Sequence, residues 1–156
     1  MPELSVDLLV PSGDGRFRSI QHGGRAFDAT PGLMLALASE PILIESRATL
    51  LDGTVIEFTA RVPTVEMALV IKAHAYASRR EDRDVEDIYR LLEITDTYPS
   101  DEIGGWRLNE QGLGGSRRDV AGHLHDLARG SRRLDIAGLP PSRLAALIAG
   151  HITLTR

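Results

Sequence analysis

The chain has 156 residues, enough for one domain with a proper core, and its 42% hydrophobic and 26% charged residues are typical of a globular protein rather than a disordered or fibrous one. The formal net charge of -4 argues against general coating of nucleic acid, although a local basic face is compatible with it. The sequence has no cysteine, which excludes disulfides, Cys-ligated zinc and thiol catalysis.

The first ten residues, MPELSVDLLV, lack the basic start and apolar stretch of a signal peptide. No apolar run approaches the roughly 20 residues that span a bilayer. We therefore expect a cytoplasmic protein with no membrane association.

Leu4 to Val10 form a nearly continuous apolar run that ends at a Pro-Ser-Gly turn, which predicts a buried strand. The strand carries one acid, Asp7. A buried carboxylate is costly unless it is paired or bound to a metal. Two interpretations of Asp7 follow: a metal ligand, or a side chain near the strand end that bonds to backbone or to an arginine.

The next segment, Ser12 to Ala29, is rich in Gly, Arg and Asp, and we expect a loop. Thr30 followed by Pro31 has the composition of a helix start, with Thr as the N-cap and Pro at the first helical position. A short helix to about Ala38 is therefore predicted.

Two apolar runs, Ile42 to Leu50 and Thr54 to Val62, are separated by three residues that end in Gly53. This spacing predicts a hairpin with a bulge, because the last loop position favours a left-handed backbone. The register sets Arg47 opposite Glu57, an attractive pair. We expect one face of the hairpin to pack on helices.

Pro63-Thr64 begins a second helix, to about Ala77, that is apolar on most of its surface and is therefore expected to be central. A turn from Ser78 to Asp82 follows. The third predicted helix runs from about Arg83 to Glu93, with apolar residues on one side and acids on another.

Tyr98 to Gly115 is punctuated by Pro and Gly and is expected to be irregular. Two helices follow, from Ser116 to Gly130, with Asp119 completing a capping box, and from Pro140 to Gly150. The predicted fold is α+β: a small mixed or antiparallel sheet, made of the first strand and the hairpin, packed against about five helices.

Lys72 is the only lysine of the chain, and it lies on the mostly apolar second helix. Its ammonium either reaches the helix edge or meets an acid or a phosphate. Within the block from Arg79 to Asp87, Arg83 with Asp87 and Arg80 with Asp84 have the i, i+4 spacing of surface ion pairs worth about 0.3 to 0.5 kcal/mol each.

The histidines are scattered and show no triad-like or metal-binding spacing: His22, His74, His123, His125 and His151. Five arginines make the C-terminal third locally positive, either as a solvated face or as a nucleic-acid surface. No aromatic residues alternate with them, which favours the solvated face. They are Arg117, Arg118, Arg129, Arg132 and Arg133.

The segment PTVEMALVIKAHAYASRREDRDVEDIYRLL, taken with the strand VDLLVP and the hairpin, resembles the AbiEii-type nucleotidyltransferases. These form a branch of the DNA polymerase beta-like superfamily that includes toxins of toxin-antitoxin systems. In that family a lysine-bearing helix precedes an R-D-x-x-D helix, and the match falls on Lys72, Arg83, Asp84 and Asp87. Asp7 is similar to the family's third metal-binding carboxylate.

The resemblance covers about residues 4–94 and implies a partial nucleotidyltransferase domain, 1–94, with a helical extension, 95–156, on the same core. It implies nucleotide transfer from an NTP to an RNA or protein acceptor, with Mg²⁺ held partly by Asp7. Lys72, with Arg79 and Arg83, would bind phosphates. The carboxylates Asp84 and Asp87 would anchor these cations.

The family's other two metal carboxylates come from a G-G or G-S dipeptide followed by D-x-D, and only six residues precede Asp7 here. Two-metal phosphoryl transfer needs several converging carboxylates. We therefore expect a truncated, inactive C-terminal portion that binds neither Mg²⁺ nor an NTP stably, and that is a late start, one half of a split protein completed by a companion chain, or a degenerate descendant. The alternatives are a non-catalytic module that forms a homodimer or binds an antitoxin, and a nucleic-acid-binding domain that uses the C-terminal arginines.

Overall fold

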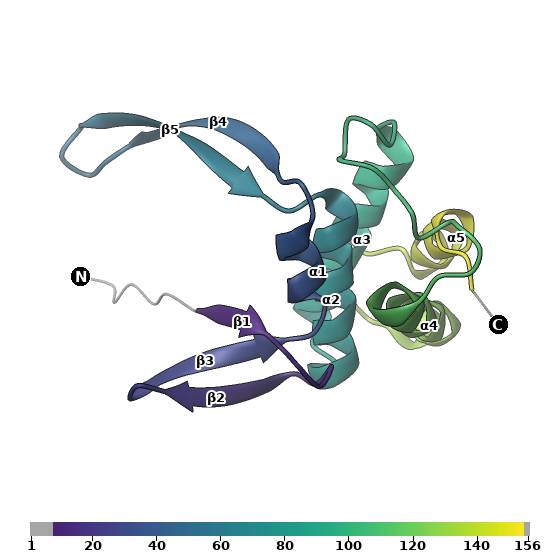
Figure 1. Ribbon diagram of the computed structural model, residues 1–156. Helices are drawn as coiled ribbons and strands as arrows, with labels where there is room; N and C mark the ends of the chain where they lie inside the picture. The colour runs from purple at the N-terminus through teal and green to yellow at the C-terminus, as the bar shows by residue number, and fades with distance from the viewer. Residues whose placement is uncertain (1–7, 155–156) are drawn as a thin grey trace.

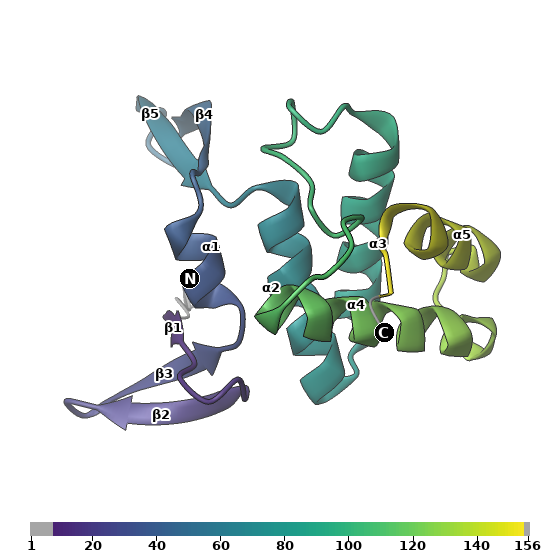
Figure 2. The same ribbon diagram turned by 45° about the vertical axis from the view of Figure 1, so that its right-hand side comes forward.

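The computed structural model describes residues 8–154, which form five α-helices and two small β-sheets. The α+β class and the number of helices agree with the prediction. Figures 1 and 2 show the two sheets and α1 on one side of α2, and the helices α3, α4 and α5 on the other side.

The first sheet has three strands in the order β1-β3-β2, where β1 is Leu9–Pro11, β2 is Arg18–His22 and β3 is Arg25–Thr30. Strand β1 is parallel to β3, and β2 is antiparallel to it. The predicted loop over residues 12–29 is therefore wrong from Arg18 onward. The Gly23-Gly24 turn explains the difference: both residues have positive φ, the conformation that a tight hairpin turn requires. Asp7 and the start of the predicted first strand lie outside the described residues.

The second sheet is the hairpin of β4, Ile42–Thr49, and β5, Val55–Val62. Its register is as predicted, with Arg47 opposite Glu57 and a 2.8 Å ion pair between them. Gly53 has φ of 85°, as the bulged loop requires. The expectation that this hairpin shares a sheet with the first strand is wrong.

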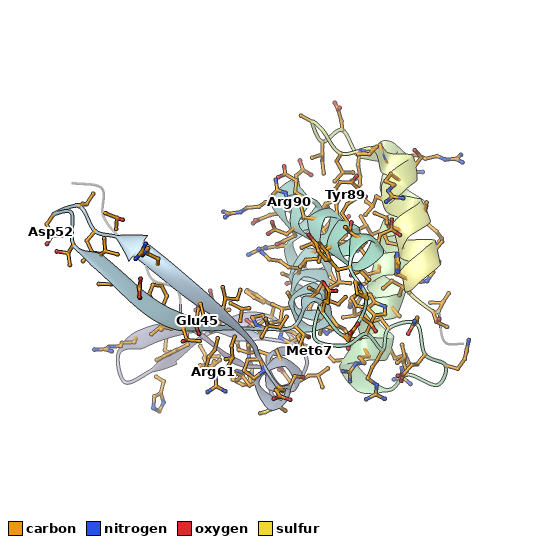
Figure 3. The ribbon with its side chains drawn as sticks, turned by 90° about the horizontal axis from the view of Figure 1, so that it is seen from above. Glu45, Asp52, Arg61, Met67, Tyr89 and Arg90 are labelled. Atoms are coloured by element: carbon orange, nitrogen blue, oxygen red, sulfur yellow. The ribbon has the colours of Figure 1, made fainter. Side chains whose placement is uncertain are left out.

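The hairpin also does not pack on the helices as predicted. It extends away from the helical part of the molecule, and Asp52 marks its distant tip (Figures 1 and 3). Side chains on its predicted buried face are largely exposed, with Ile44 at 45% and Phe58 at 48%. The alternating pattern fixed the strand register correctly, but it contained no information on what covers the apolar face.

The helices follow the predicted segments closely. They are α1 (Leu33–Ala38), α2 (Val65–Arg79), α3 (Asp82–Thr97), α4 (Gly115–Gly130) and α5 (Pro141–His151), with a 3-10 turn over Ser131–Arg133.

Two predicted helix caps, Thr30 and Ser116, are wrong, whereas α2 begins at Thr64 as the predicted helix start at Pro63-Thr64 implies. The hydroxyl of Thr64 accepts a 3.2 Å hydrogen bond from the N–H of Met67, as an N-cap does. Thr30 is not a cap, since α1 starts after Gly32, which has φ of 79°. Ser116 is not a cap either, because its hydroxyl bonds to a histidine of α2.

The hydrophobic core lies between α2, α3, α4 and α5 and extends in sequence from Met67 to Ile152. The irregular segment between α3 and α4 contributes the fully buried Leu108. Within residues 8–154, no helix has both the length and the apolar character that crossing a bilayer needs.

Candidate functional site

The turn between α2 and α3 brings the lysine of one helix against the acids of the next. Arg80 ends α2 in a left-handed conformation, with φ of 57°, and the chain reverses within two residues. The first turns of α3 therefore pack beside the C-terminal half of α2. Lys72 Nζ lies 2.7 Å from Asp87 Oδ2 and 3.8 Å from Asp84 Oδ1.

Asp84 is the centre of this cluster, because its side chain is fully buried. Its two carboxylate oxygens accept hydrogen bonds from Arg79 Nε and Nη2, at 2.7 and 2.6 Å. This is the bidentate geometry that a planar guanidinium makes with a carboxylate. The hydrogen bonds to Asp84 are the main cause that raises the pKa of Arg79. The structure thus brings together four of the predicted site residues: Lys72, Arg79, Asp84 and Asp87.

The ion pairs predicted from i, i+4 spacing are wrong. Asp84 pairs with Arg79 and Lys72 rather than Arg80, whose guanidinium stacks 5.0 Å from the Tyr76 ring centroid. Asp87 pairs with Lys72 and, at 3.6 Å, with Arg90. Contacts between the two helices therefore replace the predicted contacts along one helix.

Arg83 stands apart from the cluster. It is exposed on the first turn of α3, and no ion pair involves it within residues 8–154. Its predicted role in phosphate binding stays a prediction.

A groove of about 430 Å³ opens beside Lys72 between α2 and α3. Its floor is aliphatic, formed by Pro63, Ala68, Ile71 and Leu91. Lys72, Asp87 and Arg90 supply its charged wall. A concave, mostly apolar pocket with a few charged groups is the usual form of a small-ligand site, and this volume lies in the usual range of about 300 to 1,000 Å³.

No three His, Asp or Glu side chains among residues 8–154 are grouped as metal ligands. Asp84 and Asp87 already bond to cations, so their oxygens are poorly suited to a divalent ion. Asp7, the predicted metal ligand, lies outside the described residues.

A second polar cluster joins α2 to α4, and the sequence reasoning missed it. His74 is buried, and its Nε2 lies 2.7 Å from Ser116 Oγ. The His74 and His123 rings meet edge to face, with centroids 5.6 Å apart. Burial, and then the neighbouring His123, lower the pKa of His74. The residues are 42 and 49 positions apart, so no local spacing connects them.

Glu66 was also missed. Its buried carboxylate accepts hydrogen bonds from the backbone N–H groups of Arg107 and Leu108 and lies 2.7 Å from Arg117 Nε. It therefore fixes the segment between α3 and α4 to the start of α2. Three of the five C-terminal arginines thus have acidic partners, which reduces the basic face available to nucleic acid: Arg117 pairs with Glu66, Arg118 with Asp119 and Arg129 with Asp126.

Comparisons by family model, by sequence and by structure find no known protein that matches this chain. The geometry of the side chains is therefore the basis of the functional proposal.

Proposed function

We propose that this chain is a nucleotidyltransferase-like protein whose α2–α3 unit binds the phosphates of an NTP. The observation that carries the proposal is the Lys72 ammonium, held at 2.7 Å from Asp87 beside the buried pair of Asp84 and Arg79. The proposal also rests on the resemblance of K…R-D-x-x-D to the AbiEii-type enzymes.

The cluster holds a cation in place while leaving donors for a ligand. An ammonium has three N–H donors, and the side chain of Lys72 is 33% exposed next to the groove. Asp84 and Asp87 act as positioning residues, because they hold Lys72 and Arg79 and do not themselves attract a phosphate. Arg79 is partly exposed and adds a second donor group.

The groove beside Lys72 suits the remainder of a nucleotide. Its aliphatic floor offers an apolar surface to a base, while Arg90 lies at the charged wall near the phosphate position. Phosphates at Lys72 and a base on the floor would use both parts of this site.

Calorimetric titration with each of the four NTPs tests the proposal. We expect Lys72→Met to weaken binding at least about tenfold, since a hydrogen bond to a charged group contributes about 1.5 to 3 kcal/mol. Arg25→Gln is the matched control, because this exposed arginine lies at the tip of the β2–β3 hairpin. Equal affinities for these two variants, or no binding by the unaltered chain, would contradict the proposal.

Nucleotide transfer to an acceptor is tested separately from nucleotide binding. We expect no incorporation of labelled nucleotide into RNA or protein by the 156-residue chain with magnesium, because its sequence has only one of the three carboxylates that the resemblance requires. Robust incorporation by this chain would show that the proposal assigns the chemistry to the wrong residues.

The exposed hairpin favours a second candidate function, a partner-binding module. A two-stranded hairpin is marginal in water unless another surface covers its apolar face. Here that face is open, with Ile44, Leu50, Ile56 and Phe58 all more than two-fifths exposed.

Light scattering on the pure chain, alone and after Phe58→Ser, measures the mass in solution. A homodimer that the substitution dissociates supports the second candidate, and a monomer at every concentration counts against self-association.

A further inference from the structure

A separate pocket of about 240 Å³ lies between the loop before β2, the C-terminal half of α2, and α4. Arg16 and Phe17 come from the loop, His74 and Ser78 from α2, and His123 from α4. Three chain segments that are distant in sequence thus meet at one polar pocket.

This pocket is on a different flank of α2 from Lys72. Lys72 and His74 are two residues apart, so their side chains point about 200° apart around a helix with 3.6 residues per turn. Accordingly, Lys72 contacts acids of α3, whereas His74 contacts Ser116 and His123 of α4. A ligand here would be independent of the proposed nucleotide site.

The histidine pair gives the pocket a buried polar wall. His74 is only 8% exposed, and its Nε2 bonds to Ser116. Within residues 8–154, no hydrogen bond engages its other ring nitrogen. Gly32 makes this arrangement possible, because a Cβ there would lie 3.2 Å from His74 Cδ2 and 2.7 Å from Val70 Cγ1.

The pocket lining contains an arginine, two imidazoles and a hydroxyl but no carboxylate. Within the described residues, Arg16 has no ion pair, although the chain as a whole is acidic. The nearest acid of the loop, Asp14, is engaged elsewhere. It accepts hydrogen bonds from Ser12 Oγ and the Arg16 N–H and pairs with Arg18 at 3.1 Å. No carboxylate therefore lines the pocket, although Asp119, outside the lining, acts to raise the pKa of His74.

We propose that this pocket binds a phosphate group, carried either by a small phosphate compound or by a nucleic-acid backbone. A phosphate offers several acceptor oxygens at once, which suits a guanidinium, imidazoles and a hydroxyl that converge from three segments. The inference does not rest on the proposed function, because none of its residues belongs to the Lys72 cluster.

The test follows the histidine ring resonances of the full chain by NMR during titration with inorganic phosphate and, separately, with a short single-stranded RNA. We expect saturable shifts of the His74 and His123 signals, assigned from His74→Gln and His123→Gln. Saturation by phosphate alone identifies a small phosphate compound as the ligand. Tighter saturation by RNA identifies a nucleic-acid backbone.

Arg16→Gln should weaken this binding at least about tenfold, since it removes a charge-assisted hydrogen bond. Arg25→Gln and Lys72→Met should leave it within about twofold, because neither residue lines the pocket. Arg16 is exposed, so its substitution should not unfold the chain, and the melting temperature checks this. Absence of saturable shifts with both ligands, or equal affinities of Arg16→Gln and Arg25→Gln, would overturn the proposal.

Discussion

Asp84 shows how much of the site depends on one buried carboxylate. Its two oxygens are bonded to Arg79, and Lys72 lies 3.8 Å away, so a fully buried negative charge is balanced by two partly exposed cations. Burying a carboxylate is unfavourable without such partners. The acid therefore sets the positions of both cations, and it also ties α2 to the first turn of α3.

The substitution Arg79→Gln tests this arrangement, and Arg83→Gln is its control. Removing Arg79 leaves Asp84 buried without its bidentate partner, and we expect a loss of about 3 kcal/mol in the free energy of unfolding. Arg83 is exposed, so its replacement should change that free energy by less than about 0.5 kcal/mol. Urea denaturation measures both. Similar losses for the two variants would mean that the Asp84 carboxylate does not need Arg79.

Because His74 is buried, we predict that the free energy of unfolding depends on pH. Its pKa in the folded chain is lowered from 6.5, mainly by burial, so protons bind more readily to the unfolded chain. The contribution of His74 to the free energy of unfolding is fully present above about pH 6.5 and is lost as the pH falls below that value. His123 adds to the lowering, and Asp119 opposes it.

His74→Gln should therefore show a flatter dependence of the free energy of unfolding between about pH 7.5 and 5 than the unaltered chain. Denaturation at several pH values, with His22→Gln on the exposed β2 strand as the control, gives the comparison. Parallel pH profiles for the chain and its His74 variant would refute the assignment.

At the scale of elements, two glycines with the same left-handed backbone differ in their surroundings. Gly32 and Gly53 have φ of 79° and 85°, but a Cβ on Gly32 would clash with Val70, whereas one on Gly53 meets nothing within 4 Å. Gly53→Ala should cost only the conformational penalty, about 1 to 2 kcal/mol. Gly32→Ala should cost about 1 to 3 kcal/mol more, because α1 must move away from α2. Equal melting temperatures for the two variants would contradict the close packing.

The helices could be predicted from the sequence because their signals are local. Thr64 caps α2, Gly130 ends α4, and the apolar period of α3 is regular. The turn at Gly23-Gly24 is also local and could have predicted β2 and β3. The separation of the two sheets, however, depends on which surfaces meet, and no spacing along the chain encodes it.

The candidate site could likewise be predicted only in part from the sequence. The spacing of Lys72 and Arg79 on one helix face, and the acids of the next helix, could be read from the sequence. The partners could not, since Asp84 bonds across the turn rather than along its own helix. His74, Ser116 and Glu66 were not predicted, because their partners are more than 40 residues away.

At the scale of the whole molecule, the helical core and the two sheets differ in character. The core of α2 to α5 is continuous and buried, whereas most of the large exposed hydrophobic residues lie in the first 62 residues. The Lys72 cluster lies on α2 and α3, which belong to the buried core. The proposed nucleotide site thus lies on the buried helical core, whereas the apolar face of the hairpin is open.

The proposed function requires that Lys72 contact the phosphates of a nucleotide. Lys72 is the only lysine, so an amine-reactive acetylating reagent can modify only its side chain and the N-terminal amine. Mass spectrometry gives the acetylation rate at both positions. With an NTP at about ten times its dissociation constant, we predict that Lys72 reacts about tenfold more slowly. The N-terminal amine should be unaffected, and a nucleoside without phosphates should give little protection. An unchanged Lys72 rate at saturating NTP would contradict the account.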